Sequence, residues 1–241
     1  MQISIVIPMY NEGKIIANTA RTLSAYMQEH FESYEILFSN DGSRDDSAKI
    51  VRELELPNVR VTGYEQNQGK GAAVRHAVLE AGGDLVMFTD ADLAYGCDVI
   101  ERAYALFLET REAGGERLIL GSRNLGKGGY EGYSFLRKIM SKVYVRVLCL
   151  VGGVRLSDSQ CGCKAFEREA AKEIFRRCRV NGFAFDFEAI LWADKLGFGV
   201  REMPVKVINH GESKVHVIRD TYRMLRDLRK IRKDVKGAEL D

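Results

Sequence analysis

The sequence predicts an α/β fold in which a mostly parallel central sheet is flanked by helices. Strand-like and helix-like segments alternate through the first half of the chain, as they do in consecutive βαβ units. The strand-like segments are apolar over almost their whole length, which is typical of parallel strands buried on both faces. Polar residues follow them directly, and ligands of such sheets bind at the carboxyl ends of the strands.

The first half contains four predicted strands, each followed by a predicted helix. Short apolar runs predict strands at residues 3–8, 34–40, 58–64 and 84–90. The segments that follow them have helical composition, and Ser43 is the expected N-cap of the second helix. These helices are predicted at residues 12–30, 43–54, 69–81 and 98–113.

The second half is less regular. A glycine-rich segment at 124–133 is expected to be a mobile loop, and a second loop at 157–166 is expected to lead into a short strand. Further strands are predicted at residues 117–123 and 200–208. Further helices are predicted at residues 133–151, 183–197 and 214–236.

The composition narrows the class of protein. With 241 residues, 46% of them hydrophobic, the chain has an ample core as one large domain or two small ones. The net charge of +2 gives no indication of a nucleic-acid partner. Five cysteines without zinc spacing favour a reducing cytosol. We recognise no signal peptide, and the longest uncharged apolar run, 147–154, is far shorter than the ~20 residues of a membrane span.

Two carboxylates one residue apart, Asp90 and Asp92, end the fourth predicted strand. Residues i and i+2 of a strand point to the same side, so both side chains are expected to face one ligand. Hard oxygen ligands suit Mg²⁺ or Mn²⁺, which keep other coordination positions for water and phosphate. The alternative is a solvated turn, where aspartate is common. The row of polar strand ends favours the metal site.

The other strand ends carry side chains suited to a nucleotide. Tyr10 has a ring that can stack on a base, Glu12 can accept a hydrogen bond from a ribose hydroxyl, and Asp41 can accept one from a base edge. Lys70 and the helix amides beside it are placed to meet an anion. The plainer alternatives are a helix start capped by Asn11 and an Asp-Gly turn after the second strand.

These segments together resemble glycosyltransferase family 2, which has the GT-A nucleotide-diphospho-sugar transferase fold. The resemblance runs from residue 3 to residue 215, and the order and spacing of its motifs make it specific. The motifs are IVIPMYNE, NDGSRDDS, NQGKGAAVRHA, FTDADLA, GSR, SDSQCGCKAF, FAFDFE and GESKV. The later ones are most similar to the branch that charges dolichyl and other polyprenyl phosphates, and DSQCGCKAF and FAFDFE favour its glucosyl type.

The resemblance implies a catalytic domain at 1–213, followed by a basic amphipathic helix at 214–241. It implies that Asp90 and Asp92 hold Mg²⁺ or Mn²⁺, which offsets the charge of a leaving nucleoside diphosphate. Arg123 and Lys214 are expected to add positive charge. The residues expected to bind the nucleotide are Pro8, Tyr10, Asn11, Glu12, Asp41, Lys70, Asp90, Ala91 and Asp92.

Asp158 is the remaining candidate for catalysis. It is placed to act as a base or to orient the acceptor, and a hydroxyl acceptor needs a base. A phosphate-monoester acceptor is already an anion near neutral pH, because its second pKa is about 6. The alternative is a structural carboxylate that ties its loop to Lys164 or Arg155. Asp186 and Glu188 have a similar alternative, as polar residues that open a helix.

Two basic segments suit an anionic lipid surface. Residues 132–156 carry five basic residues, no acidic residue and a broad apolar face, and we expect them to shape a lipid entrance. Residues 215–236 carry eight basic and three acidic residues, and we expect them to help hold the protein on the bilayer. The alternatives for this last helix are packing on the core and binding to a membrane-protein partner. Its apolar stripe consists of Ile218, Tyr222, Leu225, Leu228 and Ile231.

The sequence therefore predicts a metal-dependent, inverting enzyme that is peripheral on the cytosolic face of a membrane. It is expected to move glucose from UDP-glucose onto a polyprenyl or dolichyl phosphate. Three alternatives stay open. They are the same enzyme using GDP-mannose, a family 2 transferase with a hydroxyl acceptor, and a nucleotide-sugar-binding subunit of a membrane complex without turnover of its own.

Overall fold

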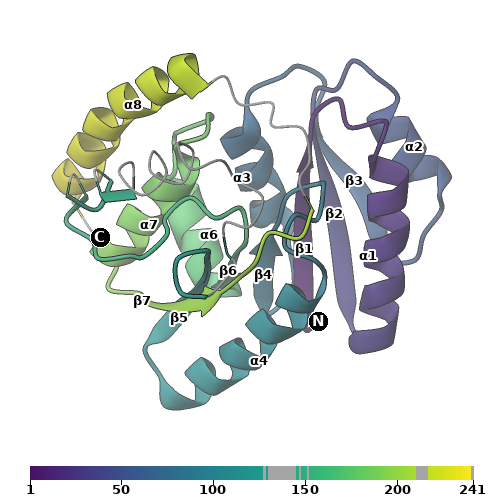
Figure 1. Cartoon of the computed structure of the whole chain (residues 1–241), viewed down its shortest axis with the longest axis horizontal. Coiled ribbons are helices and arrows are strands. Elements are labelled where there is room, and N and C mark those ends of the chain that lie inside the picture. Colours follow the sequence, from purple (N-terminus) through teal and green to yellow (C-terminus); the bar gives the residue numbers. More distant parts are fainter. Residues whose placement is uncertain (127–128, 130–144, 147, 151, 210–216, 240–241) are drawn as a thin grey trace.

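The centre of the molecule is a mostly parallel sheet, as predicted. The computed structural model describes residues 1–126, 129, 145–146, 148–150, 152–209 and 217–239. The strands are β1 (Ile3–Met9), β2 (Tyr34–Asp41), β3 (Val59–Tyr64), β4 (Leu85–Phe88), β5 (Glu116–Ser122), β6 (Lys164–Glu167) and β7 (Gly199–Pro204). They form a seven-stranded sheet in the order β3-β2-β1-β4-β6-β5-β7 (Figure 1). Of these strands, β6 alone runs antiparallel to its two neighbours.

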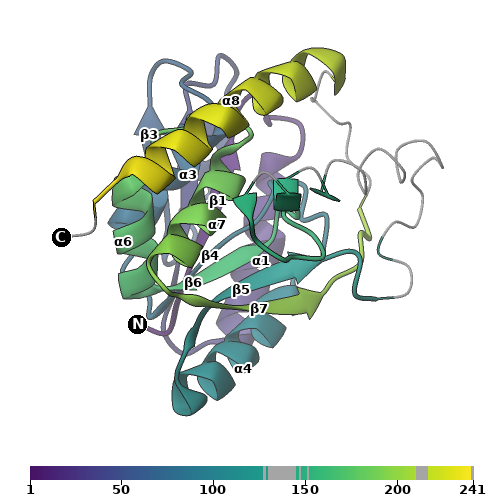
Figure 2. The same cartoon turned by 90° about the vertical axis from the view of Figure 1, so that its left-hand side faces the viewer.

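Helices cover both faces of this sheet. One layer consists of α1 (Ile16–His30), α2 (Ser47–Glu53) and α4 (Asp98–Ala113). The opposite layer consists of α3 (Lys70–Glu80), α6 (Arg168–Arg177), α7 (Phe185–Lys195) and α8 (Val217–Gly237). Within this second layer α8 packs against α7 and crosses over it (Figure 2).

β1 shows why the strand sequences are continuous apolar runs. Ile3, Ile5 and Ile7 point into the layer of α1 and α4, whereas Val6 points into the layer of α3 and α7. All four side chains are fully buried, so both faces of the strand lie in core. Each such side chain contributes about 1.5–3 kcal/mol of burial free energy, which accounts for the absence of polar alternation.

The element boundaries differ from prediction where turns precede the helices. α1 begins at Ile16 rather than at residue 12, with Ile15 as its N-cap, so the interpretation of Asn11 as a cap was wrong. α2 begins at Ser47 with Asp46 as its N-cap, so Ser43 is not the cap either. β4 and β7 both end earlier than predicted. α6 was not predicted, and the predicted helix at 133–151 lies largely outside the described residues.

The antiparallel direction of β6 decides where its preceding loop lies. The six parallel strands bring their carboxyl ends to one edge of the sheet, and β6 begins at that same edge. Residues 157–163 therefore meet the loops that follow β4 and β5. This edge gathers the polar residues singled out in the sequence.

The described side chains of α8 show a helix packed on the core. Leu228, Ile231 and Val235 are buried in the same cluster as α7. The Lys195 ammonium donates to carbonyls at the C-terminal end of α8, which anchors that end. The alternative of core packing is thus confirmed for this part of the helix. No helix within the described ranges combines the length and apolarity that crossing a bilayer requires.

Candidate active site

Asp41 ends β2 and organises the loop that leads to α3. Its carboxylate accepts hydrogen bonds from Asn67 Nδ2 at 2.8 Å and from the backbone amides of Gln68 and Gly69 at 2.8 and 2.9 Å. The side chain is buried, and burial raises the pKa of Asp41 although the two amides oppose that effect. The structure therefore places Asp41 at the expected edge with a loop-building role, and its contact with a base stays a prediction.

The loops after β1 and β2 are joined by hydrogen bonds between side chains and backbone. The backbone amide of Asn11 donates to Ser43 Oγ at 3.1 Å, and Asn11 Oδ1 accepts from the backbone amide of Arg44 at 2.7 Å. Glu12 donates its amide to Ser47 Oγ at 2.8 Å. These contacts explain the serine-rich sequence after β2 without a helix cap at Ser43. They hold Tyr10 and Glu12 half-buried at the sheet edge.

The Asp90–Asp92 turn follows β4, which ends at Phe88. Asp90 and Asp92 both lie beyond the end of the strand. Strand pleating therefore does not align the two carboxylates, and that part of the prediction was wrong. Asp92 Oδ1 accepts from the Ala94 amide at 3.0 Å, and the Thr19 hydroxyl donates to the Ala91 carbonyl at 2.6 Å, which pins the turn to α1. Burial raises the pKa of Asp92, and the neighbouring Asp90 raises it further. The turn thus carries negative charge that its surroundings do not fully offset.

Gly162 and Tyr95 connect this turn to the loop before β6. A Cβ at Gly162 would overlap the Asp90 carboxylate, so only glycine permits this approach. The Gly162 amide donates to Tyr95 Oη at 3.1 Å. Burial raises the pKa of the Tyr95 phenol well above its usual value, Cys161 and Asp90 raise it further, and Arg123 opposes them. Tyr95 therefore links the acidic turn to the second half of the site.

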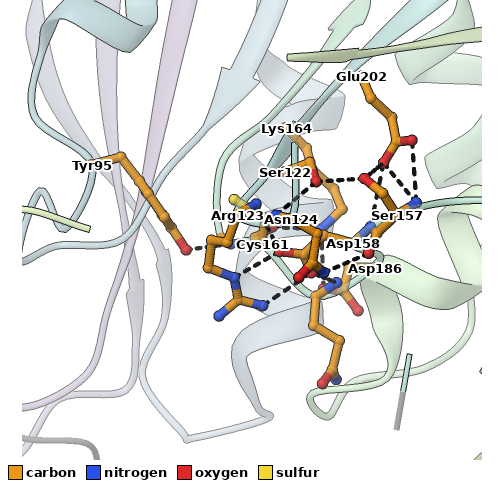
Figure 3. A network of polar contacts seen from close by, with 12 residues as sticks. Tyr95, Ser122, Arg123, Asn124, Ser157, Asp158, Cys161, Lys164, Asp186 and Glu202 are labelled. Atoms are coloured by element: carbon orange, nitrogen blue, oxygen red, sulfur yellow. Dashed lines mark hydrogen bonds and ion pairs between the residues drawn. The ribbon is translucent and has the colours of Figure 1, made fainter. Parts of the chain in front are cut away.

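Arg123 and Asp158 form a buried ion pair across that second half (Figure 3). Arg123 donates from Nε to Asp158 Oδ2 at 2.6 Å and from Nη2 to Oδ1 at 2.9 Å. Its backbone amide donates to Oδ2 at 3.1 Å. Burial alone would raise the pKa of Asp158, but the Arg123 guanidinium holds it below its usual value. The predicted structural partners, Lys164 and Arg155, were therefore wrong, because Arg123 takes that place.

Glu202 of β7 holds the loop that carries Asp158, and it was not among the predicted site residues. Its carboxylate accepts from the Ser157 amide at 2.9 Å, from the Ser157 hydroxyl at 2.6 Å and from the Asp158 amide at 3.3 Å (Figure 3). The Ser157 hydroxyl also contacts Ser122 Oγ at the end of β5. The Glu202 carboxylate and the Ser122 hydroxyl thus fix the start of this loop to β7 and β5.

Lys164 and Asp186 form a second buried ion pair beneath the same loop. The Lys164 ammonium is fully buried, lies 3.2 Å from Asp186 Oδ2 and donates to the Cys161 carbonyl at 2.6 Å. Glu188 accepts from the amides of Arg179 and Val180. The interpretation of Asp186 and Glu188 as structural carboxylates therefore agrees with their contacts.

Two of the predicted binding groups are placed differently from expectation. The amides of Gly71 and Ala72 at the start of α3 both donate to the Asn181 carbonyl, so they are already taken. The anion that Lys70 meets is the Asp90 carboxylate, with which it forms an ion pair. Lys214 lies outside the described residues. No group of three or more His, Cys, Asp or Glu side chains within the described ranges forms a metal site by itself.

The fold and the acidic turn after β4 are those of a GT-A glycosyltransferase. Residues 4–175 match the family model for glycosyl transferase family 2, and the chain belongs to that family. The family and fold predicted from the sequence are thereby confirmed.

Two dolichyl-phosphate beta-glucosyltransferases are similar in sequence to this protein over most of the chain. A dolichyl-phosphate beta-glucosyltransferase of Trichomonas vaginalis is 31% identical over 220 residues, which cover 88% of this chain and 65% of the relative. A dolichyl-phosphate beta-glucosyltransferase of Dictyostelium discoideum is 30% identical over 246 residues, covering 95% of this chain and 73% of the relative. The chain therefore spans just under two thirds of the length of the first relative.

Solved structures establish the fold. Glucosyl-3-phosphoglycerate synthase from Mycobacterium tuberculosis, in complex with Mn²⁺, UDP-glucose and glycerol 3-phosphate, superposes with a TM-score of 0.70. The sequences are 19% identical, and the match covers 100% of this chain and 82% of that chain. The same enzyme has a structure in complex with Mg²⁺ and UDP, with a TM-score of 0.68.

Proposed function

We propose that this protein transfers glucose, with inversion, from UDP-glucose to a dolichyl or related polyprenyl phosphate. The names of the two eukaryotic relatives support this donor sugar and this acceptor. The complex of the mycobacterial enzyme with UDP-glucose and Mn²⁺ supports the nucleotide and the cation. The observation that supports a phosphate acceptor is the Arg123–Asp158 pair.

The residues of the acidic turn fit a divalent cation. Asp90 and Asp92 bring two carboxylates to one turn, and Lys70 supplies a single positive charge beside them. A net negative charge with hard oxygen atoms suits Mg²⁺ or Mn²⁺, which bind proteins through one or two carboxylates and take substrate phosphates as further ligands. Asp90 and Asp92 would hold the cation, whose charge would stabilise the leaving diphosphate.

The Arg123–Asp158 pair favours a phosphate acceptor over a hydroxyl acceptor. Asp158 is fully buried, both of its oxygens accept hydrogen bonds from Arg123, and its pKa is lowered. A general base needs a pKa near the working pH and access to the proton it removes, and Asp158 has neither. A phosphate monoester needs no base because it is already ionised near neutral pH. We therefore assign Asp158 to orienting Arg123 rather than to proton transfer.

The proposed reaction is then a single displacement. A phosphate oxygen of the acceptor forms a bond to the anomeric carbon of glucose while the bond from that carbon to the diphosphate oxygen breaks. The electron pair leaves with UDP, and no proton needs to be removed. Tyr10, Glu12 and Asp41 are proposed to bind the nucleoside, and Arg123 to add positive charge where the two phosphates approach the sugar.

The basic face of α8 supports peripheral binding to the cytosolic side of an anionic membrane. Because Leu228, Ile231 and Val235 face the core, attraction in this part of the helix rests on charge. Each basic residue near an anionic surface contributes about 1 kcal/mol, and salt screens that attraction. The exposed basic residues of this part are Arg229, Lys230, Arg232, Lys233 and Lys236. Flotation with anionic liposomes should therefore fall steeply between low and high salt.

The deciding experiment incubates the purified chain with a polyprenyl phosphate in detergent and either UDP-glucose or GDP-mannose. Products are identified by mass spectrometry, with Mg²⁺, Mn²⁺ or EDTA present. We expect a glucosyl-phosphate lipid that depends on UDP-glucose and on a divalent cation. Asp92→Asn should abolish turnover, whereas Asp84→Asn at the opposite end of β4, where Asp84 pairs with Arg168, should not.

The rival functions give different outcomes. A mannosyl lipid formed from GDP-mannose would show that the donor is GDP-mannose and not UDP-glucose. Transfer to a soluble hydroxyl acceptor, or full turnover in EDTA, would contradict the proposed acceptor or metal. Tight binding of UDP-glucose with no product from any acceptor would indicate a binding subunit.

A further inference from the structure

Lys70 places a positive charge beside the carboxylates of the acidic turn. It is the first residue of α3, and its ammonium forms an ion pair with Asp90 Oδ1. About a quarter to a third of each side chain is exposed, with values of 27% and 30%, so the pair is open to incoming ligands. Burial lowers the pKa of Lys70, but Asp90 and, more weakly, Asp186 and Asp92 raise it overall. The lysine is therefore a charged side chain surrounded by carboxylates.

Asp90 lies in a turn that is held to α1, with the Gly162 backbone close to its carboxylate. Gly162 lies so close to the Asp90 carboxylate that no side chain fits between them. The turn is further held by the hydrogen bond from Thr19 to the Ala91 carbonyl. The Lys70 side chain, by contrast, is a flexible stem with a compact charge, and such a group moves easily between anions. When the charges at this turn rearrange, we expect Lys70 to move and Asp90 to stay.

We propose that Lys70 is a placeholder cation, which neutralises Asp90 before the divalent cation binds and then transfers to the diphosphate of the nucleotide. This inference rests on the proposed function, because it requires the cation and the nucleotide at this site. An ammonium and a divalent cation on one carboxylate repel each other, so the cation must displace Lys70. A diphosphate beside the turn gives the displaced ammonium a new anionic partner.

The placeholder makes cation and nucleotide binding mutually dependent. Without nucleotide, the cation must break the Lys70–Asp90 pair and separate the ammonium from its nearest anionic partner. With nucleotide bound, that cost is removed, so the nucleotide increases cation affinity and the cation increases nucleotide affinity by the same factor. Couplings of this kind are typically about 5-fold to 150-fold. The expected benefit is a site whose affinity for metal is low until its nucleotide is present.

The test measures binding of Mn²⁺ to the full chain with and without UDP, by electron paramagnetic resonance of the free ion. For Lys70→Met we expect Mn²⁺ alone to bind at least about fivefold more tightly than to the wild type. UDP alone should bind more weakly, and the increase in Mn²⁺ affinity caused by UDP should shrink. The matched control is Lys49→Met, because Lys49 pairs with Glu53 on α2 at 3.9 Å away from the turn and should change none of these affinities.

The outcomes separate this inference from the proposed function. Failure of the wild type to bind Mn²⁺ with UDP, or unchanged binding by Asp92→Asn, would overturn the metal site itself. If the wild type binds and Asp92→Asn does not, while Lys70→Met binds Mn²⁺ alone equally or more weakly, the placeholder is wrong and the metal site stands. Circular dichroism melts of all variants establish that each is folded.

Discussion

Arg123 and Asp158 are joined by two parallel hydrogen bonds, from Nε to Oδ2 at 2.6 Å and from Nη2 to Oδ1 at 2.9 Å. Asp158 is fully buried and the Arg123 side chain is 11% exposed. The pair connects the end of β5 with the loop before β6, so it fixes one half of the site to the sheet. Bidentate geometry of this kind gives both strength and direction.

Removal of Asp158 should destabilise the fold. Asp158→Ala leaves the Arg123 guanidinium buried without its main partner, and breaking a buried pair costs about 3–5 kcal/mol. Urea denaturation at pH 7 measures the change in unfolding free energy. The control is Glu53→Ala, which breaks an exposed pair with Lys49 and should cost under about 0.5 kcal/mol. Similar losses of unfolding free energy in both variants would show that the buried pair contributes no more to stability than the exposed one.

The same pair predicts a pH dependence of stability. Because the folded pKa of Asp158 is lowered, its contribution is present above the unfolded pKa of about 3.9 and is lost as the pH falls towards the folded value. The stability difference between wild type and Asp158→Asn should therefore shrink between pH 5 and about pH 3. Urea midpoints at several pH values test this. A difference that stays constant over the whole range would show that Asp158 does not titrate as described.

Glu202 should be needed to position Asp158. Glu202→Gln removes the negative charge of the group that accepts hydrogen bonds from the Ser157 hydroxyl and two backbone amides, and each hydrogen bond to a charged group contributes about 1.5–3 kcal/mol. Because these values are net contributions and glutamine keeps an acceptor oxygen, we expect a loss of about 2 kcal/mol in unfolding free energy. Glu116→Gln, which alters a pair with Arg201 nearer the surface, should cost less. Equal stability of the two variants would argue against a special role for Glu202.

Gly162→Ala should weaken cation binding without unfolding the protein. The new methyl group overlaps the Asp90 carboxylate and pushes it away from its place beside Asp92. Changes to groups that orient metal ligands typically weaken affinity about 10-fold to 100-fold. Titration of Mn²⁺ in the presence of UDP measures the loss. Gly182→Ala is the matched control, since a methyl group there meets nothing within 4 Å.

The cysteines should fall into two classes of reactivity. Cys161, Cys163 and Cys178 are buried, and burial raises the pKa of Cys161 to about 11 and those of the other two well above the usual value. Thiolates are the reactive form, so these three should resist alkylation in the native protein at pH 8. Cys97 and Cys149 are half-buried and therefore more accessible, so they should react first even though burial also raises the pKa of Cys97. Mass spectrometry of the alkylated peptides, before and after unfolding, distinguishes the classes.

The positions of the strands along the chain and the polar sheet edge could be predicted because they follow from local pattern. Continuous apolar runs identify buried parallel strands, and Asp41, Asp90 and Asp92 all lie at or just beyond the strand ends. Helix starts were less predictable, since serine and asparagine after β1 and β2 are used to join two loops rather than to cap helices.

The partners within the site could not be predicted, because they depend on contacts between distant segments. Asp158 pairs with Arg123, 35 residues away, and Glu202 reaches Ser157 across 45 residues. An acidic residue inside a mostly apolar strand was the available signal for Glu202. Gly162 carries no chemical group, so its importance for Asp90 appears only when the two segments are seen together.

The insertion of β6 between β4 and β5 has a consequence for synthesis on the ribosome. β1 to β4 are contiguous in sequence and pair with one another, so this half of the sheet can form early. β5 emerges next but has no partner among them, because its neighbours are β6 and β7. Until β6 is translated, Leu85–Phe88 is an exposed apolar edge, and such edges promote aggregation. Ribosome pausing before residue 164 should therefore increase the dependence of this protein on chaperones.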